Sequence, residues 1–425
     1  MYARLRVRTT LASIGIALTT ALAVGCGFVA CSSSGGGGGG PDATGDSVAG
    51  DSADSSFHDA SVDGDAASMA DADAATGPDA DASPVEAAPP ELADAFSGDC
   101  GAGPSGEPLD LSCTGLYSDF ASKTVASDLQ AYAPGLVLWS DGADKLRWIY
   151  LPAGQKIDTS SMDEWTFPVG TKIFKEFSLP LGDASAPTRI ETRLLWKQGP
   201  GTWYRTTYRW SADGTSSATE LTTGELDAGG TGYEIPNQTQ CDTCHNGRID
   251  GVLGFEAVSL AAPAATGLTL PELVAQTLIT DVPDASLAVP GDPTQSAAIG
   301  FLHANCGTAC HNSGQGGAQF TGFFMRLDVS TLTSVETTYV YTTGWGVPSQ
   351  NFQIPGVSNT YRLQACSTAT SCAYYRPDNR DGVAGISDGT QMPPIDTHKV
   401  DVAAMAQLAA WIDEGCDGGT DASDQ

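Results

Sequence analysis

The sequence predicts an α+β protein of several domains, in which an antiparallel β-sandwich-like region precedes a mainly α-helical region. Two observations support this fold class. Short runs of aromatic and β-branched residues, separated by Gly and Pro turns, fill residues 100–238. Apolar residues at helical spacing, preceded by capping residues, dominate residues 291–416.

The first 31 residues have the pattern of an export signal. Three arginines precede an apolar run from Leu11 to Ala23, and small residues then lead to Cys26 and Cys31. This arrangement resembles a bacterial lipoprotein signal, in which the cysteine after a short apolar box is acylated. We favour Cys31, because a Ser-Gly tether follows it directly. The resemblance implies a lipid anchor in the outer membrane, facing the periplasm or the cell surface. Plain secretion is the alternative.

An acidic Gly/Ser/Asp/Ala spacer is expected over residues 32–99, and a disordered tail over residues 417–425. Residues 41–99 hold 15 acidic and no basic residues, and large apolar side chains are scarce there. Residues 100–425 hold 36 acidic and 17 basic residues, for a net charge of −19. Because phosphate binding needs a basic face, nucleic acid is not an expected partner.

The region from 100 to 238 should contain several strands of an antiparallel sheet, either a sandwich or a curled barrel. Gly and Pro turn signals separate the expected strands, and most of the tryptophans lie in this region, where core packing is their ordinary role. The strand patterns cover residues 145–152, 165–179, 188–197 and 202–210.

Helical patterns follow. Residues 270–280 have helical spacing within the segment 239–290, which we interpret as a first motif with a linker helix. Asp292 caps a helix that begins at Pro293, and Asp401 caps a helix over residues 402–412. These last two helices frame the predicted domain 291–416.

Eleven cysteines in an exported chain indicate disulfides or cofactor attachment. Two of these cysteines belong to the signal and four to the two motifs described next, so five cysteines remain. Local pairing would join Cys100 to Cys113 and Cys366 to Cys372, with Cys416 left over. Connectivity cannot be read from a sequence alone.

Residues 241–245 read Cys-Asp-Thr-Cys-His, the spacing typical of covalent haem c attachment. One turn of chain would present Cys241 and Cys244 to the two vinyl groups of a haem, and His245 to its iron. Attachment takes place outside the cytoplasm, which agrees with the export signal. A disulfide or a zinc site is the alternative, but zinc would need a second Cys or His pair at matching spacing, and none is near.

Residues 306–311 read Cys-Gly-Thr-Ala-Cys-His, with one more residue between the cysteines. Three interpretations compete: a disulfide between Cys306 and Cys310, a copper-carrier pair, and a second haem with His311 as the proximal ligand. Nothing nearby resembles thioredoxin, which disfavours copper. The capped helix before the motif and the closing helix after it favour haem.

Met392 is the expected distal ligand of this second haem. Its Met-Pro-Pro segment resembles the distal methionine loop of class I cytochromes c. Core packing is the ordinary alternative for a methionine.

Together these segments resemble secreted diheme c-type cytochromes of uncharacterised function. The likeness covers about residues 115–415. It implies two haems c, a C-terminal class I cytochrome c-like domain, and electron transfer with an unidentified redox partner protein. The three-residue spacer before Cys310 departs from the family pattern. The likeness rests on "WSDGADKLRWIYLPAG" (139–154), "FPVGTKIFKEF" (167–177), "IETRLL" (190–195), "YEIPNQTQCDTCH" (233–245), "LHANCGTACH" (302–311) and "MPP" (392–394).

The first haem has no obvious second ligand. His303, His398 and Met325 are candidates by residue type, although His303 fits a surface position equally well. A five-coordinate iron would permit a redox enzyme, peroxidase-like or a small-molecule oxidase. In hydroxylamine-oxidising cytochromes a lysine is bonded to such a haem, and the likeness implies Lys175 as its counterpart. A surface binding module with structural haem is the third alternative.

Overall fold

The computed structural model describes residues 100–182, 186–283, 286–380 and 389–416. All of them belong to one compact unit of the chain, which begins at Ser83. The predicted signal with Cys26 and Cys31, the spacer 32–99 and the tail 417–425 lie outside the described residues. Among the helices of the described ranges, none combines the length and the apolar composition that crossing a membrane requires.

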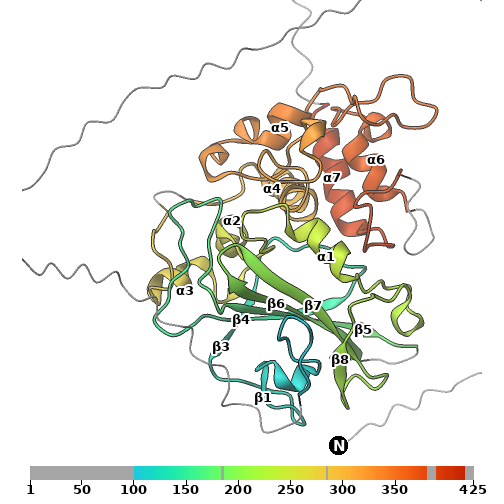
Figure 1. Ribbon diagram of the computed structural model, residues 1–425. Helices are drawn as coiled ribbons and strands as arrows, with labels where there is room; N and C mark the ends of the chain where they lie inside the picture. Colours follow the sequence, from blue (N-terminus) through green and yellow to red (C-terminus); the bar gives the residue numbers. More distant parts are fainter. Residues whose placement is uncertain (1–99, 183–185, 284–285, 381–388, 417–425) are drawn as a thin grey trace, which may run out of the picture. The chain divides into compact units, whose positions relative to one another are not determined.

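A seven-stranded antiparallel sheet forms the larger part of the fold (Figure 1). Its strand order is β8-β7-β6-β5-β4-β3-β9, a meander through β3 to β8 with the short β9 added at one edge. A two-stranded ribbon precedes it. The strands are β1 (Tyr117–Asp119), β2 (Thr124–Val125), β3 (Leu129–Ala133), β4 (Asp144–Tyr150), β5 (Lys172–Pro180), β6 (Pro187–Gly199), β7 (Thr202–Trp210), β8 (Ala218–Glu220) and β9 (Thr266–Gly267).

The antiparallel sheet confirms the strand prediction, and four of its strands match the predicted patterns. The second half of the pattern 165–179 is β5, whereas Trp165 and Phe167 are buried in the preceding loop. Asp158 and Thr166 form only an isolated bridge there.

The two faces of the sheet are covered differently, which explains why a sandwich does not form. One face packs Phe174, Leu194 and Tyr208 against the N-terminal segment that contains Leu111 and Leu116. The other face packs against helices and loops rather than against a second large sheet. The side chains that cover it are Val252, Phe255, Leu260, Leu268, Leu270 and Leu273 at one end, and Tyr233 and Ile235 at the other.

The regular elements after β8 are mostly short helices joined by loops, and Figure 1 shows α1 between the sheet and the helices α4 to α7. The α-helices are α1 (Gln238–His245), α2 (Ala257–Ala261), α3 (Leu270–Ala275), α4 (Pro293–Leu302), α5 (Tyr339–Gly344), α6 (Cys372–Asp378) and α7 (Val402–Glu414). A one-turn π-helix, η4 (His303–Gly307), continues α4. The short 3₁₀ helices are Leu111–Cys113, Ala228–Gly230, Gln319–Thr321, Val329–Thr331, Val335–Thr337 and Thr368–Thr370.

The predicted helix caps are present. The Asp292 carboxylate accepts hydrogen bonds from Thr294 N and Gln295 N at the start of α4. The Asp401 carboxylate accepts one from Ala404 N at the start of α7. Helices α4 and α7 pack together around Ile299 and Leu408. The linker helix α3 ends earlier than its apolar pattern suggests, because Thr277 adopts a left-handed conformation with φ of 55°.

One predicted disulfide is confirmed and one is wrong. Cys100 pairs with Cys113, as local spacing suggested. Cys366 pairs with Cys416 instead of Cys372, because α7 returns its C-terminal end to the Cys366 loop, where Cys366 N donates to the Ile412 carbonyl. Cys372 is unpaired and buried at the start of α6.

Candidate functional site

The second motif lies at the C-terminal end of α4, where the turn of η4 contains one residue more than an α-helical turn. Cys306 lies in η4, and both Cys310 N and His311 N donate to the Cys306 carbonyl. The bond from His311 N spans five residues, as does the bond from Thr308 N to the His303 carbonyl. Such i→i+5 turns absorb a single inserted residue within a helix. The extra residue of this motif is therefore accommodated in the turn that carries it.

His311 is fixed in the form that can coordinate a metal ion. Its Nδ1 lies 3.0 Å from the Phe323 carbonyl oxygen. A carbonyl can only accept, so Nδ1 carries the proton and Nε2 keeps its lone pair. Burial lowers the pKa of His311, and Arg376 and Arg362 lower it further, which keeps the imidazole neutral. Metal-bound histidines commonly have this second hydrogen bond.

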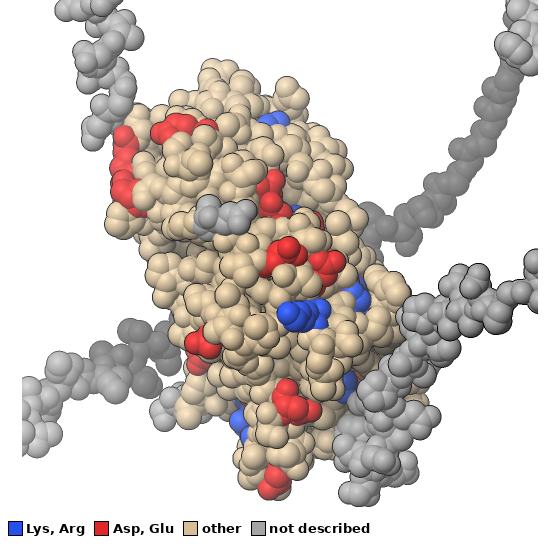
Figure 2. All heavy atoms as spheres, turned by 90° about the vertical axis from the view of Figure 1, so that its left-hand side faces the viewer, with Lys and Arg blue, Asp and Glu red and all other residues tan. Residues whose placement is uncertain are grey.

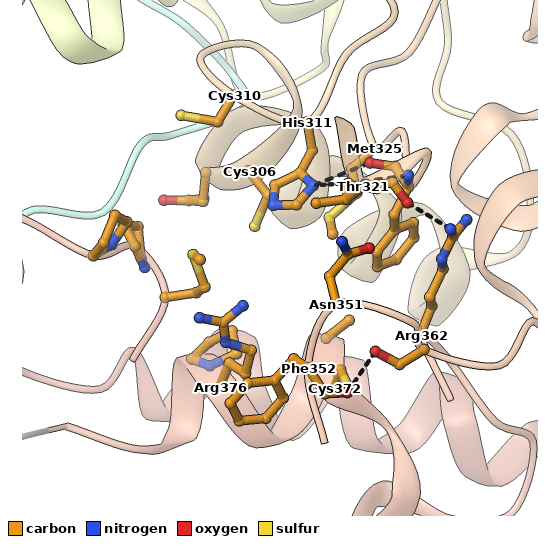
Figure 3. A pocket seen from close by; sticks show the side chains of 18 of the residues that line it. Cys306, Cys310, His311, Thr321, Met325, Asn351, Phe352, Arg362, Cys372 and Arg376 are labelled. Carbon is orange, nitrogen blue, oxygen red and sulfur yellow. Dashed lines mark hydrogen bonds between the residues drawn. The ribbon is translucent and has the colours of Figure 1, made fainter. Parts of the chain in front are cut away.

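A pocket brings the second motif together with the methionine loop. It encloses about 740 Å³ including its open mouth, and mostly apolar side chains line it. Figure 3 shows His311 and Cys306 facing Phe352 and Arg376 across this space. Of the predicted site residues, Cys306, Cys310, His311 and Met392 all line it. Pro393 and Pro394 line the pocket next to Met392.

The first motif lies on α1, at one end of the sheet. The Asn237 side chain and Gln240 form a reciprocal cap at the start of this helix, which carries Cys241, Cys244 and His245. An ion pair of 2.7 Å between Arg205 on β7 and Asp242 holds the helix against the sheet. The sequence thus places all three predicted residues on one short, anchored helix.

His245 has the same arrangement as His311. Its Nδ1 is bonded to the Gly251 carbonyl, so that Nε2 is again the free nitrogen. Burial, together with Lys175 and Arg205, lowers the pKa of His245 well below its usual value. Two segments far apart in the sequence therefore each present a neutral imidazole beside two cysteines.

The cysteines of both motifs are unpaired thiols. The disulfide interpretation of Cys306 and Cys310 is therefore wrong, as is that of Cys241 and Cys244. Burial raises the pKa of Cys241 to about 11 and that of Cys244 to about 12. Zinc binds thiolates, and the described residues contain no group of three or more His, Cys, Asp or Glu side chains placed for a metal ion.

The two motifs touch each other. A Cβ built on Gly247 would lie only 1.7 Å from the Ala309 carbonyl oxygen, so the two backbones are in close contact there. Asn312 Nδ2 donates to the Gly247 carbonyl at 3.2 Å. The Cys310 thiol contributes to the raised pKa of Cys244. Ala309 is the last of the three spacer residues, so the atypical spacer forms part of the contact between the motifs.

A row of basic side chains crosses the sheet beneath the first motif. Arg147 on β4, Lys175 on β5 and Arg193 on β6 are direct cross-strand neighbours on one face. Lys175 and Arg193 both act electrostatically on Cys241 and on His245. Burial, with Arg147 and Arg193, lowers the pKa of Lys175 to about 7.

Sequence reasoning singled out Lys175 but missed the two arginines. A signal was present, because the residue two positions after each arginine, Ile149 for Arg147 and Leu195 for Arg193, is buried on the same face of the sheet.

The three residues predicted as a further ligand at the first motif either form hydrogen bonds with other residues or line the pocket of the second motif. His303 is buried, not a surface residue: its Nδ1 accepts from Leu327 N and its Nε2 lies 3.3 Å from Glu256. Met325 lines the pocket of the second motif. His398 lies in the loop after Met392, with Nε2 at 2.7 Å from Glu234.

No family model, curated protein or solved structure matches the chain. The residues and geometry above are therefore the basis for its function.

Proposed function

We propose that the chain is an exported diheme c-type cytochrome that transfers electrons. One observation carries this proposal. The sequence predicted one ligand set from two distant segments, and all four of its residues line a single pocket: Cys306, Cys310, His311 and Met392. Two cysteines beside a neutral imidazole, facing a methionine across an apolar space, are the groups that a covalently bound haem requires.

The pocket of the second motif suits a haem in its chemistry. Its lining joins two thiols, an imidazole and a methionine with mostly apolar side chains. Cys306 and Cys310 would form the thioether bonds, His311 Nε2 would be the proximal ligand and Met392 the distal ligand. Phe323 and Phe352 provide apolar cover, which favours a higher reduction potential.

The first motif fits a second haem. Cys241 and Cys244 lie one helical turn apart, and the Gly251 carbonyl orients His245 with Nε2 free. A bound haem would supply reversible one-electron exchange. The chain would attach and orient it, keep the histidine neutral and exclude water. The C-terminal part, in which α4 and α7 pack together and α6 lines the pocket of the second motif, would then be the cytochrome c-like domain.

Export and anchoring belong to the same proposal. The signal over residues 1–31 would deliver the chain to the periplasm or cell surface, with Cys31 acylated and residues 32–99 as a tether. Acidic side chains form several separate groups on the face shown in Figure 2, and basic side chains are few. Because charge complementarity steers association, a redox partner with a basic contact face is expected.

A redox enzyme is the second candidate, and the surroundings of the first motif favour it. The residues proposed as its distal ligand lie elsewhere or are hydrogen-bonded, whereas the Lys175 amine and two arginines lie beside it. A five-coordinate first haem would be the reaction site, and the second would relay electrons. A high-spin component in the resting optical spectrum would support this candidate, and a purely low-spin spectrum would argue against it.

The experiment that tests the proposal is a haem count by the pyridine haemochrome assay on protein exported to a periplasm. We expect two haems per chain, one after Cys241→Ala with Cys244→Ala, and one after Cys306→Ala with Cys310→Ala. Cys372→Ser is the matched control, because Cys372 is unpaired and lines the second pocket without belonging to either motif. It should retain two. A count of zero in the native chain would overturn the proposal.

A further inference from the structure

Arg147 is a mostly buried residue for which the described residues provide no partner. Only 8% of this residue is exposed. Neither a hydrogen bond nor an ion pair joins its guanidinium to a described residue, and burial lowers its pKa. Arginine has five N–H donors and keeps its charge in proteins, so this side chain retains donors that the described residues do not use.

Several other buried cations among the described residues are paired with a carboxylate. Lys197 lies 2.6 Å from the Asp250 carboxylate. Arg326 pairs with Glu164. Arg193, the third member of the row across the sheet, lies 2.6 Å from Glu191 and also donates to Tyr233. The fold thus supplies an internal carboxylate where it buries these charges, but it supplies none at Arg147.

Lys175 adds a second cation beside Arg147. The two residues are direct cross-strand neighbours on β4 and β5, so their side chains leave the sheet side by side. The ammonium of Lys175 has one long hydrogen bond, 3.3 Å to the Leu253 carbonyl. The ionisable groups that act most on Lys175 are Arg147, Arg193, Cys241 and Cys244, with no carboxylate among them.

Lys175 connects this pair to the loop that orients the first motif. Its ammonium donates to the Leu253 carbonyl, two residues after Gly251, whose carbonyl is bonded to His245 Nδ1. Two neighbouring basic side chains with unused donors attract a negatively charged group.

We propose that Arg147, with Lys175 beside it, forms an anion-binding site at the first motif. Its ligand is a carboxylate or a small inorganic anion held by charge-assisted hydrogen bonds. The inference rests on the proposed function, because the first haem provides the setting. Two sources offer this chemistry: the haem's own propionate, and an exchangeable anion that binds next to the iron.

The test compares charged and neutral ligands of the ferric protein. Azide and imidazole are titrated into the haem-loaded full chain, and the Soret band is followed. Arg147→Gln should weaken azide binding by about tenfold or more, the usual effect of losing one charge-assisted hydrogen bond, and leave imidazole binding unchanged. Arg147→Lys should retain most of the azide affinity. Arg209→Gln is the matched control, since Arg209 lies on the same sheet face but is paired with Glu225 at the surface.

The propionate bending bands in the resonance Raman spectrum distinguish the two sources. Shifted bands with unchanged azide affinity would assign the site to the haem's own carboxylate. If azide does not bind the native protein, the propionate bands are the only criterion: shifted bands support the site and unchanged bands overturn it. Weakened azide binding would assign it to an exchangeable anion. Unchanged affinity together with unchanged bands would overturn the anion site.

Two further measurements separate misfolding and failure of the proposed function from failure of the anion site. A haem count on the same samples tests the proposed function separately. Thermal unfolding controls for folding: because no described residue is a partner of Arg147, Arg147→Gln should keep or raise the melting temperature.

Discussion

At the scale of single residues, two methionines line the second pocket but differ in surroundings. Met325 is buried in the apolar cluster between α4 and α7, and its backbone N–H donates to the His311 carbonyl. Met392 is only half-buried and follows α6 in the sequence. Its backbone N–H donates to the Arg376 carbonyl of that helix. The sequence predicted Met392 as the distal ligand of the second haem, and Met325 only as a candidate ligand of the first.

Replacing these two residues in parallel tests the ligand assignment. Met392→Leu should abolish the weak red-edge absorbance that is typical of methionine-ligated ferric haem, and lower the reduction potential of the second haem. Met325→Leu, a change of similar volume, should keep that band and cost less than about 1.5 kcal/mol of stability. Optical spectra and redox titrations measure both effects. If Met325→Leu alone removed the band, the ligand would be Met325.

At the scale of elements, the contact between the loop after α1 and the second motif offers a direct test. Gly247→Ala should force the Ala309 backbone away and destabilise the fold by about 1–3 kcal/mol, as overpacking does. Gly317→Ala is the matched control: it lies in the loop after the same motif, exposed, with open space around a Cβ. Denaturant unfolding should show no loss for this control. Equal stability of the two variants would contradict the close contact.

The elements also show where sequence patterns succeed. Strands β4 to β7 and helices α4 and α7 were predicted, because amphipathic periodicity and capping aspartates are local signals. The π-turn at Cys306 was not. It depends on Gly307 lying against the backbone of Met325 and Arg326, a distant segment whose proximity no local pattern reports.

At the scale of the whole molecule, the Cys366–Cys416 disulfide joins the end of α7 to a loop 50 residues earlier. Cys416→Ser should cost about 2–4 kcal/mol of stability by releasing that loop in the unfolded chain. Cys372→Ser should cost less, since Cys372 is unpaired. Thermal unfolding gives the comparison, and non-reducing peptide mapping should recover Cys366 linked to Cys416. A peptide linking Cys366 to Cys372 would contradict this connectivity.

The wrong prediction of a Cys366–Cys372 disulfide and the wrong prediction of a β-sandwich have the same cause. Both depend on which distant segments meet, and a single sequence carries that information only weakly. Spacing favoured Cys372 as the partner of Cys366, yet the return of α7 decided the pair. Likewise, the strand patterns predicted a sandwich or a curled barrel, but helices and loops around Phe255 and Tyr233 cover the face that a second sheet would need. The candidate ligand set was predictable because its signals are local motifs.

The contact of Gly247 with Ala309 has a consequence for electron transfer between the two proposed haems. If both motifs carry haem as proposed, the two irons lie in adjoining segments of one compact unit, and an electron can pass between them without leaving the protein. Such a protein can collect electrons singly from one-electron carriers and deliver two in quick succession. The extra spacer residue, which touches Gly247 directly, then helps to set the distance over which that internal exchange takes place.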